Sequence, residues 1–316
     1  MAKKILITGG AGFIGSHLAK KLKKGNYKIV LIDRFTAHST KLKRDRLKKL
    51  LHSGEYTFYE AELSDLNKVN KIFKNHKFDL ICHLAAKTNL QFNSRLYNRT
   101  NTLGTINIFE LAKNYGVPKV VFASSSMVYG NNDNRSFCET DNTDRPLSIY
   151  AASKKSAEIL AYTYHSLHKI EMVGLRFFTT YGPWGRPETA ISKFTEQIIN
   201  NQPIVIQNFG KIKKDFTYID DVINGITAAI EKKFNYELIN LGSGKSVKLE
   251  KIIDLIEKNL KIKAQKKYTA MQLGDQLETR ANIGKAKKLL GYNPKTTIEQ
   301  GIKKYIAWYK QYYSLK

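Results

Sequence analysis

Residues 4–18, KILITGGAGFIGSHL, place a short apolar run directly before a glycine-rich turn. The run at residues 4–8 predicts a buried parallel strand. Gly9, Gly12 and Gly15 follow, and glycine at these positions permits a tight turn, a close approach of the main chain to a pyrophosphate, and a helix packed near the sheet. Ordinary strand–turn–helix junctions also contain glycine, but this order of elements is the one that a dinucleotide-binding motif requires.

The second predicted strand ends at an acidic residue. Its apolar run covers residues 28–32, and Asp33 follows directly. A carboxylate at this point accepts hydrogen bonds from the adenosine ribose hydroxyls and repels a 2′-phosphate, so it predicts NAD rather than NADP as the cofactor. Arg34, the next residue, could weaken that preference.

Strand-like and helical patterns alternate as far as residue 176, which predicts βαβ units and a doubly wound parallel sheet. Further strands are expected at residues 55–60, 78–83, 119–124 and 171–176. Helices are expected at residues 12–24, 65–75, 100–115 and 148–168, with a final amphipathic helix after residue 294.

This pattern predicts an α/β protein with two interleaved lobes. Residues 1–176 are expected to form a Rossmann-type NAD-binding lobe, completed by part of residues 205–242. Residues 177–316 are expected to form mainly a smaller C-terminal α/β lobe that binds the substrate. The cofactor would lie at the carboxyl ends of the parallel strands.

The chain of 316 residues has 53 lysines and arginines against 27 acidic residues, a net charge of +26. The basic residues are spread along the whole sequence without a zinc spacing or an RNA-binding motif, so a lysine-rich surface is favoured over a nucleic-acid partner. Cys82 and Cys138 indicate neither a disulfide framework nor a metal site. With no long apolar run and no signal peptide evident, a cytoplasmic protein without a membrane span is expected.

Tyr150 and Lys154 are the strongest candidates for catalysis. Their spacing of four places both side chains on one face of a predicted helix, one turn apart. A nearby ammonium lowers the pKa of a phenol and makes it a usable acid or base. Such pairs are common by chance in a chain with 18 tyrosines, but this one follows a dinucleotide-binding motif.

Several longer motifs occur in a fixed order. They are His83-Leu84-Ala85-Ala86, Asn101 with Gly104-Thr105, Tyr150 with Lys154, and the stretches at residues 175–187, 214–221, 271–275, 290–294 and 308–309. With these residues the chain resembles the extended short-chain dehydrogenase/reductase family over its full length. Within that family it is most similar to the UDP-glucuronate 4-epimerases, which are NAD-dependent nucleotide-sugar epimerases.

The resemblance implies an epimerisation at carbon 4 of a UDP-sugar. Tyr150 would take the proton of the 4-hydroxyl while a hydride passes from carbon 4 to NAD. The 4-keto intermediate would turn and receive the hydride on its other face. Lys154 would hold the nicotinamide ribose and lower the pKa of Tyr150, and Ser125 would hydrogen-bond the reacting oxygen. NAD would stay bound through each cycle.

The resemblance also assigns residues to two sites. The cofactor site would comprise Gly9, Gly12, Phe13, Ile14, Gly15, Asp33, Glu62, Leu63, Leu84, Ala85, Ala86, Asn101, Tyr150, Lys154 and Phe177. The substrate site would comprise Thr88, Ser125, Ser126, Tyr150, Thr179, Arg186, Lys214 and Asp275. The same likeness implies a homodimer built through the helices near residues 100–115 and 148–168.

Departures from family patterns separate the possible reactions. Related 4,6-dehydratases carry an Asp-Glu pair where this chain has Ser126-Met127, and related decarboxylases carry Glu at the second position. Methionine cannot act as an acid or base, so both reactions are disfavoured. Lys214 stands where an arginine is usual.

The identity of the sugar stays open. Gln91 replaces an arginine that could hold the sugar carboxylate, which keeps a neutral or N-acetylated UDP-hexose as an alternative substrate. A non-catalytic NAD(H)-sensing or nucleic-acid-binding protein is the alternative of another class. The presence of both Tyr150 and Lys154 argues against it.

Overall fold

The computed structural model describes residues 2–36, 40–51, 56–88, 94–132, 136–270 and 277–315. Its centre is a seven-stranded parallel sheet with the strand order β11-β6-β5-β4-β1-β2-β3. The strands are β1 (Lys3–Thr8), β2 (Tyr27–Asp33), β3 (Tyr56–Glu60), β4 (Leu80–His83), β5 (Lys119–Ser125), β6 (Glu171–Phe177) and β11 (Tyr236–Leu241). The predicted fold class, a doubly wound parallel sheet, is therefore confirmed. The edge strand β11 comes from residues 205–242 and pairs with β6.

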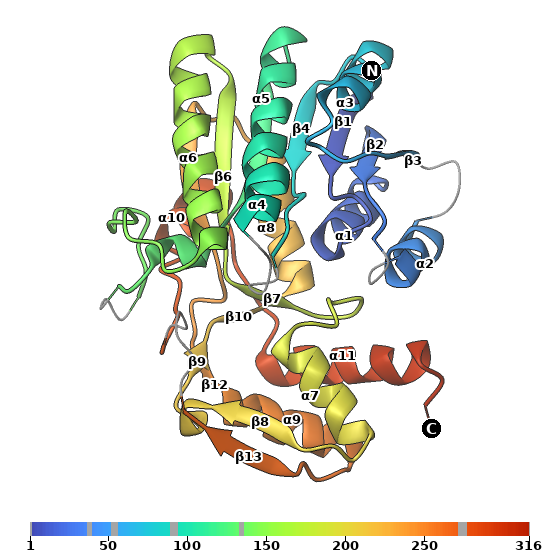
Figure 1. The fold of residues 1–316 in the computed structure, drawn as a ribbon, viewed down its shortest axis with the longest axis vertical. Coiled ribbons are helices and arrows are strands. Elements are labelled where there is room, and N and C mark those ends of the chain that lie inside the picture. The colour runs from blue at the N-terminus through green and yellow to red at the C-terminus, as the bar shows by residue number, and fades with distance from the viewer. Residues whose placement is uncertain are drawn as a thin grey trace.

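Helices cover both faces of the sheet, and the alternation of side chains along the strands explains why. In β1, Ile5 and Ile7 join a buried cluster on one face, whereas Leu6 joins the cluster on the other. The first face carries α1 (Phe13–Leu22), α2 (Thr40–Leu50) and α8 (Ile219–Glu231). The second face carries α3 (Leu66–Asn75), α5 (Gly104–Asn114) and α6 (Ile149–His168), with α5 and α6 side by side in Figure 1.

One predicted helix is divided in the structure. Residues 98–103 form a turn of π-helix (Asn98–Leu103) between the short α4 (Ser94–Tyr97) and α5, where the sequence predicted one helix from residue 100 to 115. The Asn101 side chain explains the change, because it bonds to both main-chain groups of Lys87 at 2.8 and 3.0 Å instead of facing solvent. Single π-turns often mark functional segments.

The C-terminal residues form a smaller lobe against the carboxyl ends of the central strands (Figure 1). Its helices are α7 (Ala190–Ile199), α9 (Leu249–Leu260) and α11 (Ile298–Tyr312). Its strands pair as β7 (Thr179–Tyr181) with β10 (Phe216–Tyr218), β9 (Lys213–Lys214) with β12 (Val247–Lys248), and β8 (Ile204–Gln207) with β13 (Lys266–Thr269). The helix α10 (Gly284–Leu290) packs back against α8 and β11.

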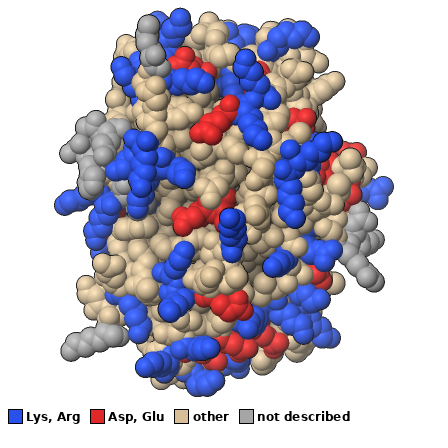
Figure 2. Space-filling view, turned by 180° about the vertical axis from the view of Figure 1, so that it is seen from behind, with Lys and Arg blue, Asp and Glu red and all other residues tan. Residues whose placement is uncertain are grey.

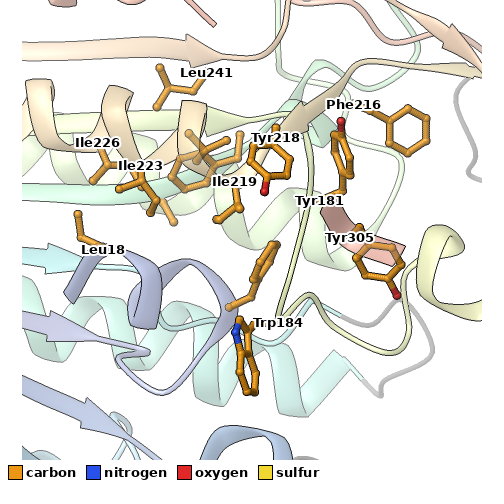
Figure 3. Packing of buried hydrophobic residues seen from close by; sticks show 14 of the residues in the cluster. Leu18, Tyr181, Trp184, Phe216, Tyr218, Ile219, Ile223, Ile226, Leu241 and Tyr305 are labelled. Atoms are coloured by element: carbon orange, nitrogen blue, oxygen red, sulfur yellow. The ribbon is translucent and has the colours of Figure 1, made fainter. Parts of the chain in front are cut away.

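The two lobes share one apolar cluster. It runs from Leu18 on α1 and Ile226 on α8 to Tyr305 on α11, with Tyr218 and Trp184 between them (Figure 3). Burial of large apolar side chains is the main favourable contribution to folding, so this cluster fixes the smaller lobe over the strand ends.

On the face of the molecule in Figure 2, lysine and arginine side chains are scattered and do not form one stripe. This distribution agrees with the lysine-rich surface predicted from the sequence. Within the described residues, every helix is too short or too polar to cross a bilayer.

Candidate active site

A cleft of about 420 Å³ opens at the carboxyl ends of the central strands. It is lined by these residues that the sequence analysis selected: Gly9, Gly12, Phe13, Ile14, Gly15, Asp33, Glu62, Leu63, Leu84, Ala85, Ala86, Thr88, Ser125, Ser126, Tyr150, Lys154, Phe177, Thr179 and Arg186. Asn101 and Lys214 do not line this cleft. Asp275 and Gln91 lie outside the described residues.

The glycine turn at the start of α1 has no room for side chains. Gly9 has a φ of +71°, which favours glycine, and a Cβ there would lie 2.9 Å from the main chain of Ala85. A Cβ on Gly15 would lie 2.2 Å from the Gly9 carbonyl oxygen, and one on Gly12 would lie 2.8 Å from the same atom. Gly12 is the N-cap residue of α1 and supplies no side-chain hydrogen bond, so the first N–H groups of the helix suit a phosphate. These features fit the diphosphate of NAD.

Asp33 lies at the adenosine end of the expected NAD site and is held by its neighbours. Its Oδ2 accepts the Ala11 N–H at 3.0 Å, which ties β2 to the glycine turn. Its Oδ1 accepts from the Arg34 N–H at 2.7 Å and from the Lys43 ammonium at 2.6 Å. Arg34 in turn contacts Glu62. Lys43 was not predicted from the sequence, because α2 carries no motif that marks it.

Replacing Asp33 with Asn tests its role in choosing the cofactor. Asn keeps an acceptor oxygen but removes the charge that opposes a 2′-phosphate, so we expect affinity for NADP to rise relative to NAD. Titration of the cofactor-stripped protein with both dinucleotides measures the ratio. An unchanged ratio would show that another group sets the preference.

Tyr150 and Lys154 lie in the first turns of α6. Ser148 caps this helix by accepting the Ala151 N–H, and both side chains are buried in the cleft wall. Lys154 Nζ donates to the Ala123 carbonyl oxygen at 2.9 Å, at the end of β5. Burial lowers the pKa of Lys154 from its ordinary 10.5 to about 8.

Burial raises the pKa of Tyr150, and the positive charge of Arg186 and the Ser125 hydroxyl oppose that rise. The sequence analysis expected Lys154 to lower this pKa. In the structure the Lys154 ammonium donates to the Ala123 carbonyl oxygen, and the charge of Arg186 opposes the rise of the Tyr150 pKa. The effect of Lys154 on the phenol stays a prediction.

Replacing Lys154 with Met should reveal the cost of burying its charge. The unfolded chain binds the lysine proton up to its ordinary pKa, whereas the folded chain loses it from about pH 8. Wild-type stability therefore gains from rising pH in this window, and the Met variant lacks that gain. Between pH ~7 and pH ~10, the free energy of unfolding of the wild type should therefore rise by about 2–3 kcal/mol relative to that of the Met variant. Urea unfolding of both proteins at several pH values measures these free energies. A difference between the two proteins that does not change with pH would contradict the prediction.

The three serines after residue 123 have different surroundings. Ser124 donates to Glu158 Oε1 at 2.6 Å and is held by that buried carboxylate. Ser125 ends β5 and accepts the Met127 N–H at 3.2 Å, which starts a short 3₁₀ turn (Ser126–Tyr129). Ser125 and Ser126 line the cleft beside Tyr150, and so does Met127, which brings no ionisable group.

The far wall of the cleft comes from residues 177–189. Arg186 donates to the Thr88 hydroxyl, which brings this wall close to the end of β4. Thr179 on β7 lies in the same wall, and so does Glu188, which the sequence analysis did not select. Among the described residues, no group of three or more His, Cys, Asp or Glu side chains could hold a metal ion.

Comparisons with known proteins agree with this geometry. Protein CapI of Staphylococcus aureus is 39% identical over 332 residues, which cover 98% of this chain and 99% of that protein. A UDP-glucuronate 4-epimerase of Thermodesulfobacterium geofontis is 38% identical, with 97% of this chain and 96% of that protein covered. The crystal structure of UDP-glucuronic acid 4-epimerase from Bacillus cereus, in complex with UDP-glucuronic acid and NAD, is 34% identical. It superposes with a TM-score of 0.91 over 98% of this chain and 100% of that one.

A family model described as the NAD dependent epimerase/dehydratase family matches residues 5–242, which span the glycine turn, Tyr150, Lys154 and Arg186. The chain therefore belongs to the NAD dependent epimerase/dehydratase family.

Proposed function

We propose that this protein is an NAD-dependent UDP-glucuronate 4-epimerase, which interconverts UDP-glucuronate and UDP-galacturonate through a 4-keto intermediate. The observation that carries the proposal is the position of Tyr150 in one cleft with the glycine turn on one side and Arg186 on the other. The similarity to UDP-glucuronate 4-epimerases extends over nearly the whole chain, including both walls of that cleft.

The residues of the cleft can move and hold the proton that this reaction requires. NAD, when bound in the glycine turn, supplies reversible hydride transfer. Tyr150 accepts the proton of the sugar 4-hydroxyl and returns it to the 4-keto oxygen, and the charge of Arg186 favours the phenolate. Ser125, which lines the same cleft and contacts the Tyr150 hydroxyl, hydrogen-bonds the reacting oxygen in this proposal.

The cleft wall beside the serines favours epimerisation over two related reactions. Elimination of water or loss of a carboxylate needs a further acid or base beside the sugar. Met127 occupies the wall next to Ser125 and Ser126 and supplies none. This position therefore disfavours elimination of water and loss of the carboxylate, as the sequence predicted.

Proton NMR of the purified protein with UDP-glucuronate tests the proposal. The coupling between sugar protons H3 and H4 distinguishes the two C4 epimers, and parallel samples contain UDP-glucose or UDP-N-acetylglucosamine, each with and without added NAD. Conversion of UDP-glucuronate is the expected result. Conversion of a neutral sugar alone would keep the mechanism and overturn the substrate.

We also propose that the protein is a homodimer assembled through α5 and α6. The outer face of α6 exposes large apolar side chains, with Ile159 57% and Tyr162 56% accessible, and surfaces of this kind mark protein interfaces. Light scattering should give twice the chain mass, and Ile159→Asp should give the monomer mass. A monomeric wild type at working concentration would exclude the dimer.

We further propose a cytoplasmic location. Within the described residues, Cys82 and Cys138 are both free thiols, and unpaired cysteines suit a reducing compartment.

A further inference from the structure

Arg46 is a buried cation that the proposed mechanism does not use. It lies on α2 with 3% of its surface exposed, and burial lowers its pKa to about 10. Its described hydrogen bonds all go to main-chain carbonyl oxygens. A buried charge is costly unless its surroundings compensate for it, so a residue held in this way requires an explanation.

The partners of Arg46 belong to the two opposite walls of the cleft. Nη1 donates to the Ala11 carbonyl oxygen in the glycine turn at 3.3 Å. Nε and Nη2 donate to the Trp184 carbonyl oxygen at 3.0 and 2.7 Å, and Nη2 also donates to Gly185 at 3.2 Å. The planar fork of arginine can reach these positions together, whereas the single ammonium of lysine cannot. Arg46 thus joins the cofactor side of the cleft to its substrate side.

The Trp184 turn needs such support. Trp184 has a φ of +64°, a left-handed conformation that is unfavourable for a bulky residue. Its ring packs against Trp308 and Tyr312 with centroids 5.4 and 5.1 Å away, at the edge of the buried cluster in Figure 3. Aromatic packing holds the side chain of this turn, and Arg46 holds its main chain.

Arg186 follows this turn by two residues. It contacts Thr88 across the cleft, and its charge opposes the rise of the Tyr150 pKa. Any movement of the Trp184 main chain would be transmitted to Arg186, because only one residue separates them.

We propose that Arg46 is a positioning residue that fastens the Trp184–Gly185 turn to the glycine loop and so sets the place of Arg186 over the substrate. This inference rests on the proposed function, since it concerns the same cleft. It predicts that Arg46, which lines the cleft on the side of the glycine turn, affects sugar-nucleotide binding and the protonation of Tyr150 through the position of Arg186.

A double-mutant cycle tests this proposal. The variants are Arg46→Met, Arg46→Lys, Arg186→Gln and the Arg46→Met/Arg186→Gln double variant, with Lys48→Met on the exposed face of α2 as the matched control. Calorimetry on the NAD-loaded proteins gives the Kd of UDP-glucuronate and of UDP. We expect Arg46→Met to raise the Kd of UDP-glucuronate by about tenfold, because it misplaces Arg186. The double variant should have the same Kd as Arg186→Gln alone, because Arg46 acts through Arg186. Additive effects, or an Arg46→Met that binds like Lys48→Met, would overturn the proposal.

Two further measurements separate positioning from general destabilisation. The rising limb of kcat against pH should move to higher pH in Arg46→Met, because a displaced Arg186 stabilises the Tyr150 phenolate less. The KM for UDP-glucuronate should also rise, because the substrate binds more weakly. In a Trp308→Phe background, acrylamide should quench Trp184 more strongly when Arg46 is replaced. An unchanged pH profile with unchanged quenching would refute the positioning role.

The outcomes distinguish this inference from the proposed function. A wild-type protein that binds UDP-glucuronate or UDP but does not convert UDP-glucuronate would refute the proposed function. The Kd values of the double-mutant cycle would still test the positioning role of Arg46. Should Arg46→Met fail to fold, Arg46→Lys takes its place in the cycle, because it keeps the charge and loses the fork. Quenching of Trp184 needs no ligand, so it measures the exposure of this turn whether or not any sugar nucleotide binds.

Discussion

Replacing Tyr150 with Phe is expected to lower kcat by about a hundred- to ten-thousandfold, the usual contribution of general acid–base catalysis. Phe keeps the ring that packs near Tyr97, with centroids 6.3 Å apart, and removes only the titrating oxygen. Binding of NAD and of the UDP-sugar should therefore change little. Initial rates and calorimetry on the same preparation separate the loss of turnover from any loss of affinity.

A control on the same helix makes this test specific. Tyr162 is 56% exposed on the outer face of α6, so Tyr162→Phe should keep wild-type turnover. Near-normal turnover in Tyr150→Phe would mean that another group handles the proton. Loss of NAD from Tyr150→Phe would mean instead that the phenol holds the cofactor site together.

Replacing Glu158 with Gln is expected to cause the largest loss of stability. Glu158 and Arg176 form a two-pronged ion pair at 2.8 and 2.9 Å, and both side chains are only 2% exposed. Removing one partner of a buried ion pair leaves an uncompensated charge and costs about 3–5 kcal/mol. The free energy of unfolding from urea titration measures this cost.

The same substitution bears on the active site. Glu158 lies one turn beyond Lys154 on α6 and accepts the Ser124 hydroxyl, so it joins that helix to β5 behind the serines. Glu299 provides the matched control, because it forms a half-exposed ion pair with Lys251 at 3.4 Å. Glu299→Gln should cost less than about 1 kcal/mol. Equal losses in the two variants would show that burial does not govern the cost.

Local patterns in the sequence were sufficient for most of the fold. The apolar run of β1 and the glycine spacing after it concern residues a few positions apart, and their geometry follows from the chain itself. The same holds for Tyr150 and Lys154, whose spacing places them on one face of α6. The six predicted strands are all present in the central sheet. The π-turn before α5 was missed, because the contact of Asn101 with Lys87 overrides local helix propensity.

The sequence by itself therefore determined the doubly wound sheet, the dinucleotide turn and the pair of Tyr150 with Lys154. Only the tertiary structure decided the partners of the charged groups: Lys43 with Asp33, Glu158 with Arg176, and Arg46 with Trp184, which is 138 positions away. It also brought the charge of Arg186 to act on the Tyr150 phenol. The physical reason is that a charge acts through distance and burial in space, and neither can be read from spacing along the chain.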